Sequence, residues 1–351
     1  MTLTPEQQAE IAEARATSRT TLRATSEGME KHLYTAHEVL DHGLVRVIDY
    51  MGDDAAITQA ARVSYGRGTK AVQNDEGLIR YLMRHWHSTP FEMCEVKFHV
   101  KLPVFVARQW IRHRTANVNE YSARYSILDR EFYIPAPEHL AAQSTVNNQG
   151  RGELLEGEEA ARVLDILRDD AMRSYDHYED MLSQEGQKGL ARELARMNLP
   201  ANVYTQWYWK IDLHNLLHFL KLRVDSHAQW EIQEYGRVMA GMLKRVAPLS
   251  YEAWIDYDVC GARMSRMELE ALRKLVSAAP DALTTSGGQN LDRGALAELG
   301  MSNREIAELT TKLQAAAVPD FDLDVSKGEP AEVFAERMAK AVPQVDESPT
   351  E

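Results

Sequence analysis

Hydrophobic and polar positions follow two different periods along the first part of the chain. In LVRVIDYM (44–51) and EVKFHVKLPV (95–104), apolar residues recur at alternate positions, which is typical of β-strands. Between them, DDAAITQAARVSY (53–65) and NDEGLIRYLMRHW (74–86) begin with acidic or Asn residues and repeat apolar residues with helical spacing. The pattern therefore predicts a strand, two helices and a second strand, in a folded core that begins near Gly43.

Helical spacing dominates the rest of the chain. Pro103 can start the helix VFVARQWIRH, because a proline is tolerated in the first turn, and this helix is expected to run into a loop. The pattern then predicts a polar glycine-containing loop at 144–153, a long helix at about 154–185, and further helices near 188–197 and 212–244. Helices packed on an antiparallel or mixed sheet make an α+β fold.

Three regions differ in character along the chain. Residues 1–42 are polar and mildly helical, and we interpret them as a leader. Residues 43–260 hold the mixed strand and helix pattern of the main domain. Residues 261–351 are interpreted as a helical appendage, in which Ser265 and Glu268 form a capping-box pattern, with an acidic tail that is expected to be disordered.

Composition excludes several classes of protein. Of the 351 residues, 44% are hydrophobic and 26% charged, as in ordinary globular proteins, and no apolar run approaches the roughly 20 residues that span a bilayer. The N-terminus lacks the apolar segment of a secretory signal, so we expect a cytoplasmic protein.

Only Cys94 and Cys260 occur, which leaves no disulfide framework and no CxxC pair for a structural zinc ion. A net charge of −13 makes a general nucleic-acid binder a poor candidate.

A basic stretch interrupts this acidic chain. Residues 101–130 contain six Lys or Arg residues and two acidic ones, which could simply be a solvated basic face. The arginines, however, are interleaved with aromatic and amide side chains: Arg108, Arg112, Arg114 and Arg124 with Trp110, Tyr121, Tyr125, Gln109, Asn117 and Asn119. Guanidinium groups bind phosphates in a bidentate manner and aromatic rings stack on bases, so this combination favours a nucleotide as ligand.

A second candidate region is DLHNLLHFLKLRVDSHAQWEIQEY (212–235). On a helical wheel, Arg223 and His227 fall within or beside the apolar arc. Because arginine keeps its charge, Arg223 needs an acceptor, which could be Glu231 or an anionic ligand. His214 and His218 have the spacing of zinc ligands, but packing or hydrogen-bonding roles are favoured because no third ligand is evident.

Other patterns decide less. Arg192 and Arg196, one helical turn apart, could extend an anion site or lie on a solvated face. Ser122 has no base arranged beside it in the sequence, so we do not expect a nucleophile there. The chain contains no GxSxG, GxGxxG or Walker motif.

Several of these segments together resemble one enzyme family. RHRTANVNEYS (112–122) is similar to the signature of the flavin-dependent thymidylate synthases, in which RHR is followed after seven residues by Ser. Further similar blocks, in the family's order within about residues 43–255, are HSTPFE, KLPVFVARQWIRHR, EFYIPAP, ARMNLPANVYTQWYW and LRVDSHAQWEIQEY. The chain departs from the family pattern at Asn117, where a serine is common, and at Met93, where a histidine is common.

The resemblance implies an α+β homotetramer with FAD as cofactor and active sites between subunits. Such an enzyme methylates dUMP reductively to dTMP, with 5,10-methylenetetrahydrofolate as carbon donor and NADPH as reductant. Neither a nucleic acid nor a membrane is implied as a partner, and no metal ion. Residues 43–260 would be the catalytic domain.

The resemblance also assigns roles to individual residues. Arg223 matches the residue that activates uracil. The positions matching dUMP-binding residues are Gln109, Arg112, Glu120, Tyr121, Ser122, Ala123, Arg124, Arg196 and Arg223. The positions matching FAD-binding residues are Thr89, Arg112, His113, Arg114, Glu120, Asp212, Leu213, His214 and His218.

Two rival functions use the same residues differently. A noncatalytic nucleotide- or RNA-binding module would use the basic stretch to bind a polynucleotide in a salt-sensitive manner, without a flavin. A metal-dependent nucleotide hydrolase would be built on His214, His218 and His227.

Overall fold

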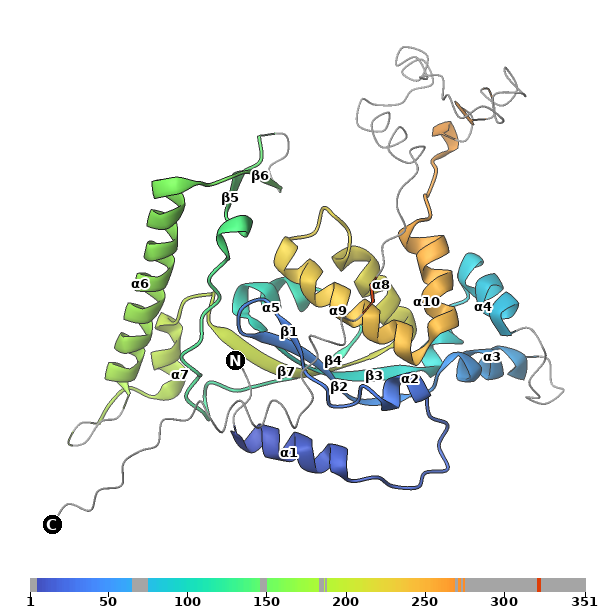
Figure 1. Ribbon diagram of the computed structural model, residues 1–351, viewed down its shortest axis with the longest axis horizontal. Coiled ribbons are helices and arrows are strands. Elements are labelled where there is room, and N and C mark those ends of the chain that lie inside the picture. The colour runs from blue at the N-terminus through green and yellow to red at the C-terminus, as the bar shows by residue number, and fades with distance from the viewer. Residues whose placement is uncertain are drawn as a thin grey trace. The chain divides into compact units, whose positions relative to one another are not determined.

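A computed structural model of the chain describes residues 5–64, 75–145, 150–182, 186, 188–268, 271–272, 274 and 321–322 (Figure 1). The chain divides into two compact units. The first extends to Tyr251 and also includes Phe321 and Asp322, and the second begins at Glu252.

An antiparallel sheet organises the first unit. Five of the described strands form one sheet, in the order β1 (His37–Val39), β2 (Gly43–Met51), β3 (Glu95–Pro103), β7 (Tyr204–Asp212) and β4 (Asn117–Glu120). In its register Phe98 and Val118 both lie opposite Trp209, on either side of β7. The α+β class predicted from the sequence is confirmed.

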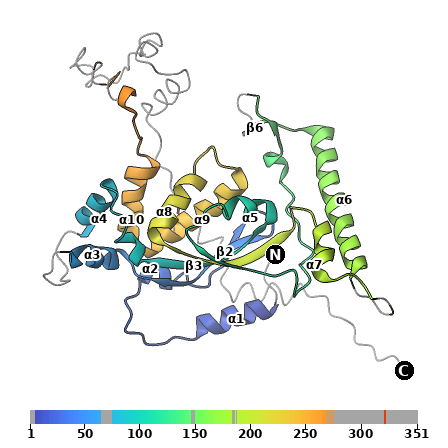
Figure 2. The ribbon, with the colours of Figure 1, turned by 180° about the vertical axis from the view of Figure 1, so that it is seen from behind.

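One face of the sheet is apolar and covered by helices. Its side chains include Phe98, Val100 and Trp209, each almost completely buried. The helices α5 (Val104–Trp110), α8 (Leu213–Arg223) and α9 (Trp230–Val246) lie on this side (Figures 1 and 2). The buried indole of Trp110 on α5 lies 5.3 Å from the ring of Trp209 and 4.7 Å from that of Phe219 on α8, measured between centroids. This aromatic cluster holds α5 and α8 together against the sheet.

The opposite face of the sheet is polar. Arg46 on β2 donates from Nε to His99 Nδ1 at 2.9 Å, and His99 Nε2 lies 2.9 Å from Gln206 Oε1. Burial, and secondarily the charge of Arg46, lowers the pKa of His99 to about 3, so this imidazole stays neutral. Helix α1 (Pro5–Ala16) lies on this side, seen below the sheet in Figure 1.

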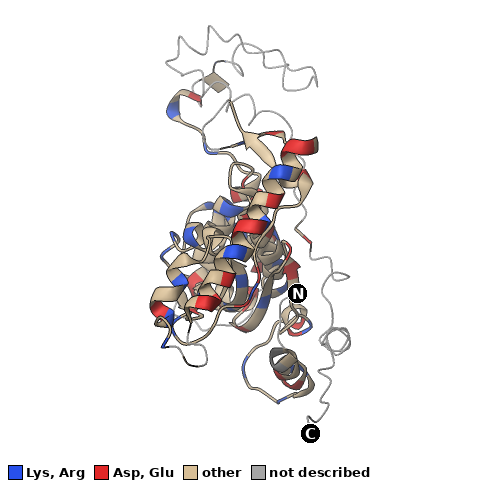
Figure 3. Cartoon of the chain, turned by 90° about the vertical axis from the view of Figure 1, so that its left-hand side faces the viewer, with Lys and Arg blue, Asp and Glu red and all other residues tan. Residues whose placement is uncertain are grey.

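The remaining elements connect and flank the sheet. Before β3 lie α2 (Glu27–Glu30), α3 (Asp54–Val63), α4 (Asp75–Arg84) and the 3-10 turn η1 (Phe91–Met93). Between β4 and β7 lie η2 (Pro137–His139), β5 (Ala141–Gln143), β6 (Arg151–Leu154), α6 (Gly157–Met181), α7 (Arg192–Ala195) and η3 (Arg196–Asn198). Figure 3 shows basic and acidic residues along α6, as expected for a helix with a solvated face.

The second unit is described only in part. Helix α10 (Pro248–Trp254) runs into it and continues as the π-helical turn η4 (Ile255–Val259). The capping box predicted for Ser265 and Glu268 is confirmed, because each donates its backbone N–H to the other's side chain. Within the described residues, no helix combines the length and the apolar character needed to cross a membrane.

Several element boundaries differ from those that the sequence predicts. Strands β2 and β3 and helices α3, α4 and α6 are close to the predicted ranges. The prediction of a single helix at 212–244 is wrong, because α8 ends at Arg223 and α9 begins only at Trp230. In the gap, the Asp225 carboxylate accepts the backbone N–H of His227 at 2.8 Å, which replaces a helical hydrogen bond.

Strands account for the other differences. The predicted loop at 144–153 includes the first residues of β6, which pairs with β5. Strand β4 lies in the segment predicted to be a loop after α5, and the leader contains β1, which pairs with β2.

Most of residues 261–351 lie outside the described residues, so the three-region division stays a prediction. Of the cysteines, Cys94 is buried and Cys260 exposed, and both are free.

Candidate active site

The turn after α5 presents cationic side chains on the surface. The backbone N–H of His113 bonds to Trp110 O at 2.9 Å and that of Arg112 to Gln109 O at 3.4 Å, which ends the helix. Arg112 and Arg114 are exposed. Among the described residues, neither guanidinium has a hydrogen bond or an ion pair. Their donors are therefore available to an anion.

Arg223, at the end of α8, is half-buried beside this turn. Its Nη2 donates to Gln109 O at 3.4 Å, a long and weak hydrogen bond. Its Nε is buried and has no hydrogen-bond partner among the described residues, and the same holds for Gln109 Oε1. Burial lowers the pKa of Arg223, and the side chain still carries its charge. Arg223 and Gln109 are thus joined by one weak hydrogen bond, while Arg223 keeps an unpaired donor and Gln109 an unpaired acceptor.

Glu231 does not neutralise Arg223. Its carboxylate, 3% exposed, pairs with Arg151 and accepts a hydrogen bond from the Tyr133 hydroxyl at 3.0 Å. The ion pair between Arg223 and Glu231, one of two alternatives from the sequence, is therefore wrong. The other alternative, an anionic ligand, stays a prediction.

Histidines surround the same turn. The ring of His113 lies 5.8 Å from that of His218 and 5.4 Å from that of Phe219. Burial, followed by the charges of His218 and Arg223, lowers the pKa of His113 to about 4. His113 is thus neutral near pH 7. His214 on α8 is half-buried and His218 is exposed.

The predicted position of His227 is wrong. It lies outside α8 with its side chain 87% exposed, and its Nδ1 lies 2.9 Å from Asp225 Oδ1. The wheel placed it near the apolar arc because it assumed a continuous helix. No group of three potential metal ligands among His, Cys, Asp and Glu occurs within the described ranges.

The start of α8 meets the turn that precedes β3. Leu213 donates its backbone N–H to Cys94 O at 2.8 Å. The Asp212 carboxylate caps α8 by accepting the backbone N–H of Asn215 at 2.9 Å and its side-chain amide at 2.7 Å. Thr89 is exposed in the turn at η1, which packs against α8. Both oxygens of Asp212 thus already hold the helix.

Strand β4 carries Glu120 to the edge of the sheet. Its carboxylate is exposed, and Oε1 accepts a hydrogen bond from the hydroxyl of Thr205 on β7 at 2.8 Å. The next residue, Tyr121, donates its backbone N–H to Gln206 O at 2.8 Å. Thr205 was not predicted as a site residue, although the alternation of Thr205 with Trp207 in YTQWYWKID (204–212) indicates a strand that orients both the same way.

The signature continues in a compact turn. The carbonyl of Ser122 accepts the backbone N–H of Tyr125 at 3.0 Å, and its hydroxyl accepts that of Arg124 at 3.3 Å. Within the described part of the chain, no histidine or carboxylate bonds to Ser122. Ala123 is 7% exposed and packs in a cluster with Tyr175 of α6.

Helix α7 is attached to this turn by polar contacts. Arg124 pairs with Glu193 at 3.1 Å, and Arg192 Nη1 donates to Tyr125 O at 2.6 Å. Arg196 is exposed, and in the described segments its guanidinium has no partner. Arg192 therefore has a role in holding the turn, whereas Arg196 is available to a ligand.

The predicted nucleotide-binding residues thus fall into two groups. One comprises Gln109, Arg112 and Arg223 between α5 and α8. The other comprises Glu120 to Arg124, together with Arg196 at the start of η3.

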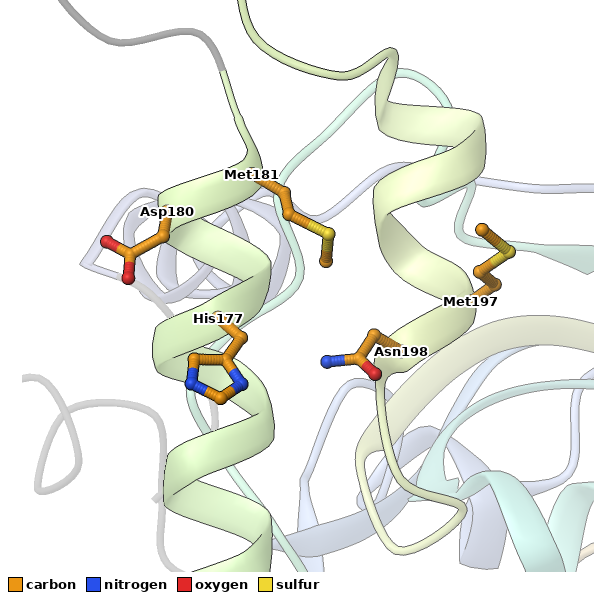
Figure 4. A pocket seen from close by; sticks show the side chains of 5 residues that line it. All are labelled: His177, Asp180, Met181, Met197 and Asn198. Carbon is orange, nitrogen blue, oxygen red and sulfur yellow. The ribbon is translucent and has the colours of Figure 1, made fainter.

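A pocket of about 450 Å³ lies between α6 and the α7–η3 segment (Figure 4). Its lining residues are His177, Asp180, Met181, Met197 and Asn198. In Figure 4, Met181 points toward the opposite segment and Asp180 points away from it. None of the predicted site residues lines this pocket.

The donor set fits the groups that the resemblance implies. The pyrophosphate of FAD and the phosphate of dUMP both need positive charge, which Arg112, Arg114 and Arg196 supply without competing partners. The orphaned Arg223 Nε and Gln109 Oε1 are a donor and an acceptor, as the polar edge of a pyrimidine requires.

Comparisons with known proteins agree with this chemistry. Residues 46–249 match the family described as "Thymidylate synthase complementing protein". The flavin-dependent thymidylate synthase of Ruegeria pomeroyi is 69% identical over 287 residues, covering 82% of this chain and 95% of the relative. The enzyme of that name from Gluconobacter oxydans is 56% identical, covering 90% of this chain and 100% of the relative.

Solved structures give the same result. The UMP/dUMP methylase PolB from Streptomyces cacaoi, bound with 5-Br dUMP, is similar with a TM-score of 0.57 and 30% sequence identity. The match covers 63% of this chain and 98% of PolB. Sequence motifs, fold, site chemistry and relatives all agree, and the chain belongs to the flavin-dependent thymidylate synthase family.

Proposed function

We propose that the protein converts dUMP into dTMP by reductive methylation, with FAD as cofactor, 5,10-methylenetetrahydrofolate as carbon donor and NADPH as reductant. The structural observation that carries this proposal is Arg223, a half-buried cation with an unpaired Nε beside the unpaired Gln109 Oε1. In a member of this family, uracil is the ligand that satisfies both.

Arg223 acts on the pyrimidine by electrostatics. A fixed guanidinium beside the ring favours the anionic form of the uracil, which raises electron density at C5 and makes that carbon more nucleophilic. Because the side chain is half-buried, water screens this charge less than it would at the surface. Neither cysteine is needed as a nucleophile, and burial raises the pKa of Cys94 to about 12.

The turn at Ser122 to Arg124 and the nearby Arg196 bind the phosphate of dUMP. Arg124 is now paired with Glu193, but both side chains are about half exposed. Such a surface pair is worth only about 0–1 kcal/mol, so a phosphate displaces Glu193 easily. Ala123 is buried and can offer only its backbone, while Tyr121 and Glu120 lie at the entrance to the turn.

The flavin binds along the turn after α5 and the start of α8. Arg112 and Arg114 supply charge for its pyrophosphate, and the imidazoles of His113 and His218 supply planar hydrogen-bonding groups. Thr89, Leu213 and His214 line the junction with η1, where Asp212 holds the helix start in place. When bound, FAD carries reducing equivalents from NADPH to the transferred carbon.

The family's homotetramer, with active sites shared between subunits, is part of the proposal. Large apolar side chains next to the candidate site are exposed: Ile111 by 41%, Val118 by 42%, Tyr125 by 75% and Met197 by 77%. Exposed apolar side chains gathered near a functional site favour burial against another subunit. A cytoplasmic location stays a prediction from the sequence.

Product formation tests the proposal directly. The purified, FAD-loaded protein is incubated anaerobically with dUMP, methylenetetrahydrofolate and NADPH, and nucleotides are separated by chromatography. We expect dTMP that requires all three substrates and FAD. Polynucleotide binding without any dTMP would overturn the proposal in favour of a binding module, and dUMP hydrolysis on addition of a metal ion would favour a hydrolase.

A further inference from the structure

Thr205 is a buried hydroxyl that the roles described so far do not use. It lies on β7 and is 5% exposed, with its side chain on the same face as the buried Trp207. Its Oγ1 donates a hydrogen bond to Glu120 Oε1 at 2.8 Å. The contact links the interior of the sheet to an exposed carboxylate of the candidate site.

This hydrogen bond is not needed to hold β4 in place. Backbone pairing already fixes Glu120 opposite Trp207, and Tyr121 N donates to Gln206 O just beyond it. In the described ranges Glu120 has no ion pair with lysine or arginine. The Thr205 hydroxyl therefore fixes the rotation of a side chain that would otherwise sample several rotamers.

We propose that Thr205 is a positioning residue for dUMP binding. It holds Glu120 Oε1, so that Oε2 faces the surface and accepts a hydrogen bond from dUMP. The donors on the uncharged part of that nucleotide are the uracil N3–H and the deoxyribose hydroxyl. This inference rests on the proposed function, because it assigns dUMP as the ligand of Glu120.

The hydroxyl, rather than the volume, of Thr205 carries the effect. Valine has nearly the same shape but cannot donate, so Thr205→Val removes the hydrogen bond and preserves packing. Because Glu120 is exposed, its carboxylate is then solvated by water instead of being left unsatisfied. The fold should thus tolerate the substitution. Binding of dUMP should become weaker, because the Glu120 carboxylate then has to be ordered when the ligand binds.

The experiment compares variants of the FAD-loaded, full-length protein. Calorimetry measures the dissociation constant of dUMP, initial rates give kcat and KM, fluorescence quenching gives the FAD dissociation constant, and a melting curve gives Tm. Thr58→Val is the matched control, since Thr58 is 1% exposed and, within the part of the chain that the structure describes, its hydroxyl bonds only to the Ala55 carbonyl of its own helix at 3.0 Å.

We expect Thr205→Val to raise the dUMP dissociation constant roughly tenfold, which corresponds to about 1.4 kcal/mol. Its KM for dUMP should rise while Tm stays within a few degrees of wild type. Thr205→Ser keeps a donor and should restore dUMP binding to within about threefold. Thr58→Val should leave dUMP binding unchanged. In a Glu120→Gln background, Thr205→Val should add much less than it does alone.

Wild-type dUMP affinity in Thr205→Val would overturn the inference. A Thr205→Ser variant as weak as Thr205→Val would do the same, because it would make packing the cause, and so would fully additive effects with Glu120→Gln. The proposed function fails separately: a wild-type protein that binds dUMP but forms no dTMP contradicts the reaction, while the calorimetric comparison still decides the role of Thr205.

Discussion

Replacing Arg223 by alanine should separate catalysis from folding. Among the described residues its one hydrogen bond, to Gln109 O, is 3.4 Å long, and its guanidinium carbon lies 5.8 Å from the centroid of the Phe219 ring. Loss of these weak contacts should lower the free energy of unfolding by no more than about 1–2 kcal/mol. The flavin should stay bound, because the resemblance does not assign Arg223 to the FAD site.

The effect on turnover should be much larger. A charge-assisted hydrogen bond to bound dUMP contributes about 1.5–3 kcal/mol, and a unit charge about 4 Å away acts with at most about 4 kcal/mol at an effective dielectric constant near 20. At about 1.4 kcal/mol per factor of ten, kcat/KM for dUMP should fall by roughly 10-fold to 1,000-fold. Arg223→Lys keeps the positive charge but loses the planar guanidinium group, so its activity should lie between that of the wild type and that of Arg223→Ala.

The assay is the anaerobic rate of dTMP formation as a function of dUMP concentration, with FAD occupancy measured by absorbance. Arg223→Ala with kcat/KM within threefold of wild type would refute the assigned role. Loss of flavin together with turnover would contradict the assignment of Arg223 to dUMP alone, because it would make Arg223 a flavin-binding residue as well.

Two further substitutions test other parts of the account. Ser122→Ala should keep measurable activity, since the Ser122 hydroxyl accepts a backbone N–H and has no base beside it; a covalent dUMP adduct on Ser122 would contradict this. His99 has a folded pKa of about 3 against about 6.5 when unfolded, so it contributes stability that is lost as pH falls from about 6.5 toward 3. Urea unfolding at several pH values should show His99→Gln with a shallower loss, and an unchanged slope would count against a neutral, buried His99.

The elements that could be predicted are those in which a segment buries one regular face, whereas the strands β1, β4 and β7 of the five-stranded sheet were not predicted. β2 and β3 alternate because one side of each packs under helices, and α3 and α4 repeat apolar residues at helical spacing. Strand β4 could not be found this way, since Asn117 to Glu120 are all exposed and carry no burial pattern. The gap between α8 and α9 was missed because a helical wheel assumes a continuous helix.

Site residues were predictable to the extent that their chemistry is local in the sequence. The arginines around His113 stand out in an acidic chain, and the structure leaves Arg112 and Arg114 without partners among the described residues. The partner of Arg223 could not be decided from spacing, since Glu231 is taken by Arg151, far away in sequence. Thr205 acts through a contact between β7 and β4, and a long-range strand pairing is invisible to local pattern.

The central claim is that dUMP and FAD bind in one site that Arg223 and the turn after α5 help to form. The most direct measurement is the flavin absorbance of the FAD-reconstituted protein during anaerobic addition of NADPH, with and without dUMP. The account predicts bleaching of the flavin band at a rate that changes when dUMP is present. A protein that binds no flavin, or whose bleaching is identical with and without dUMP, would contradict it.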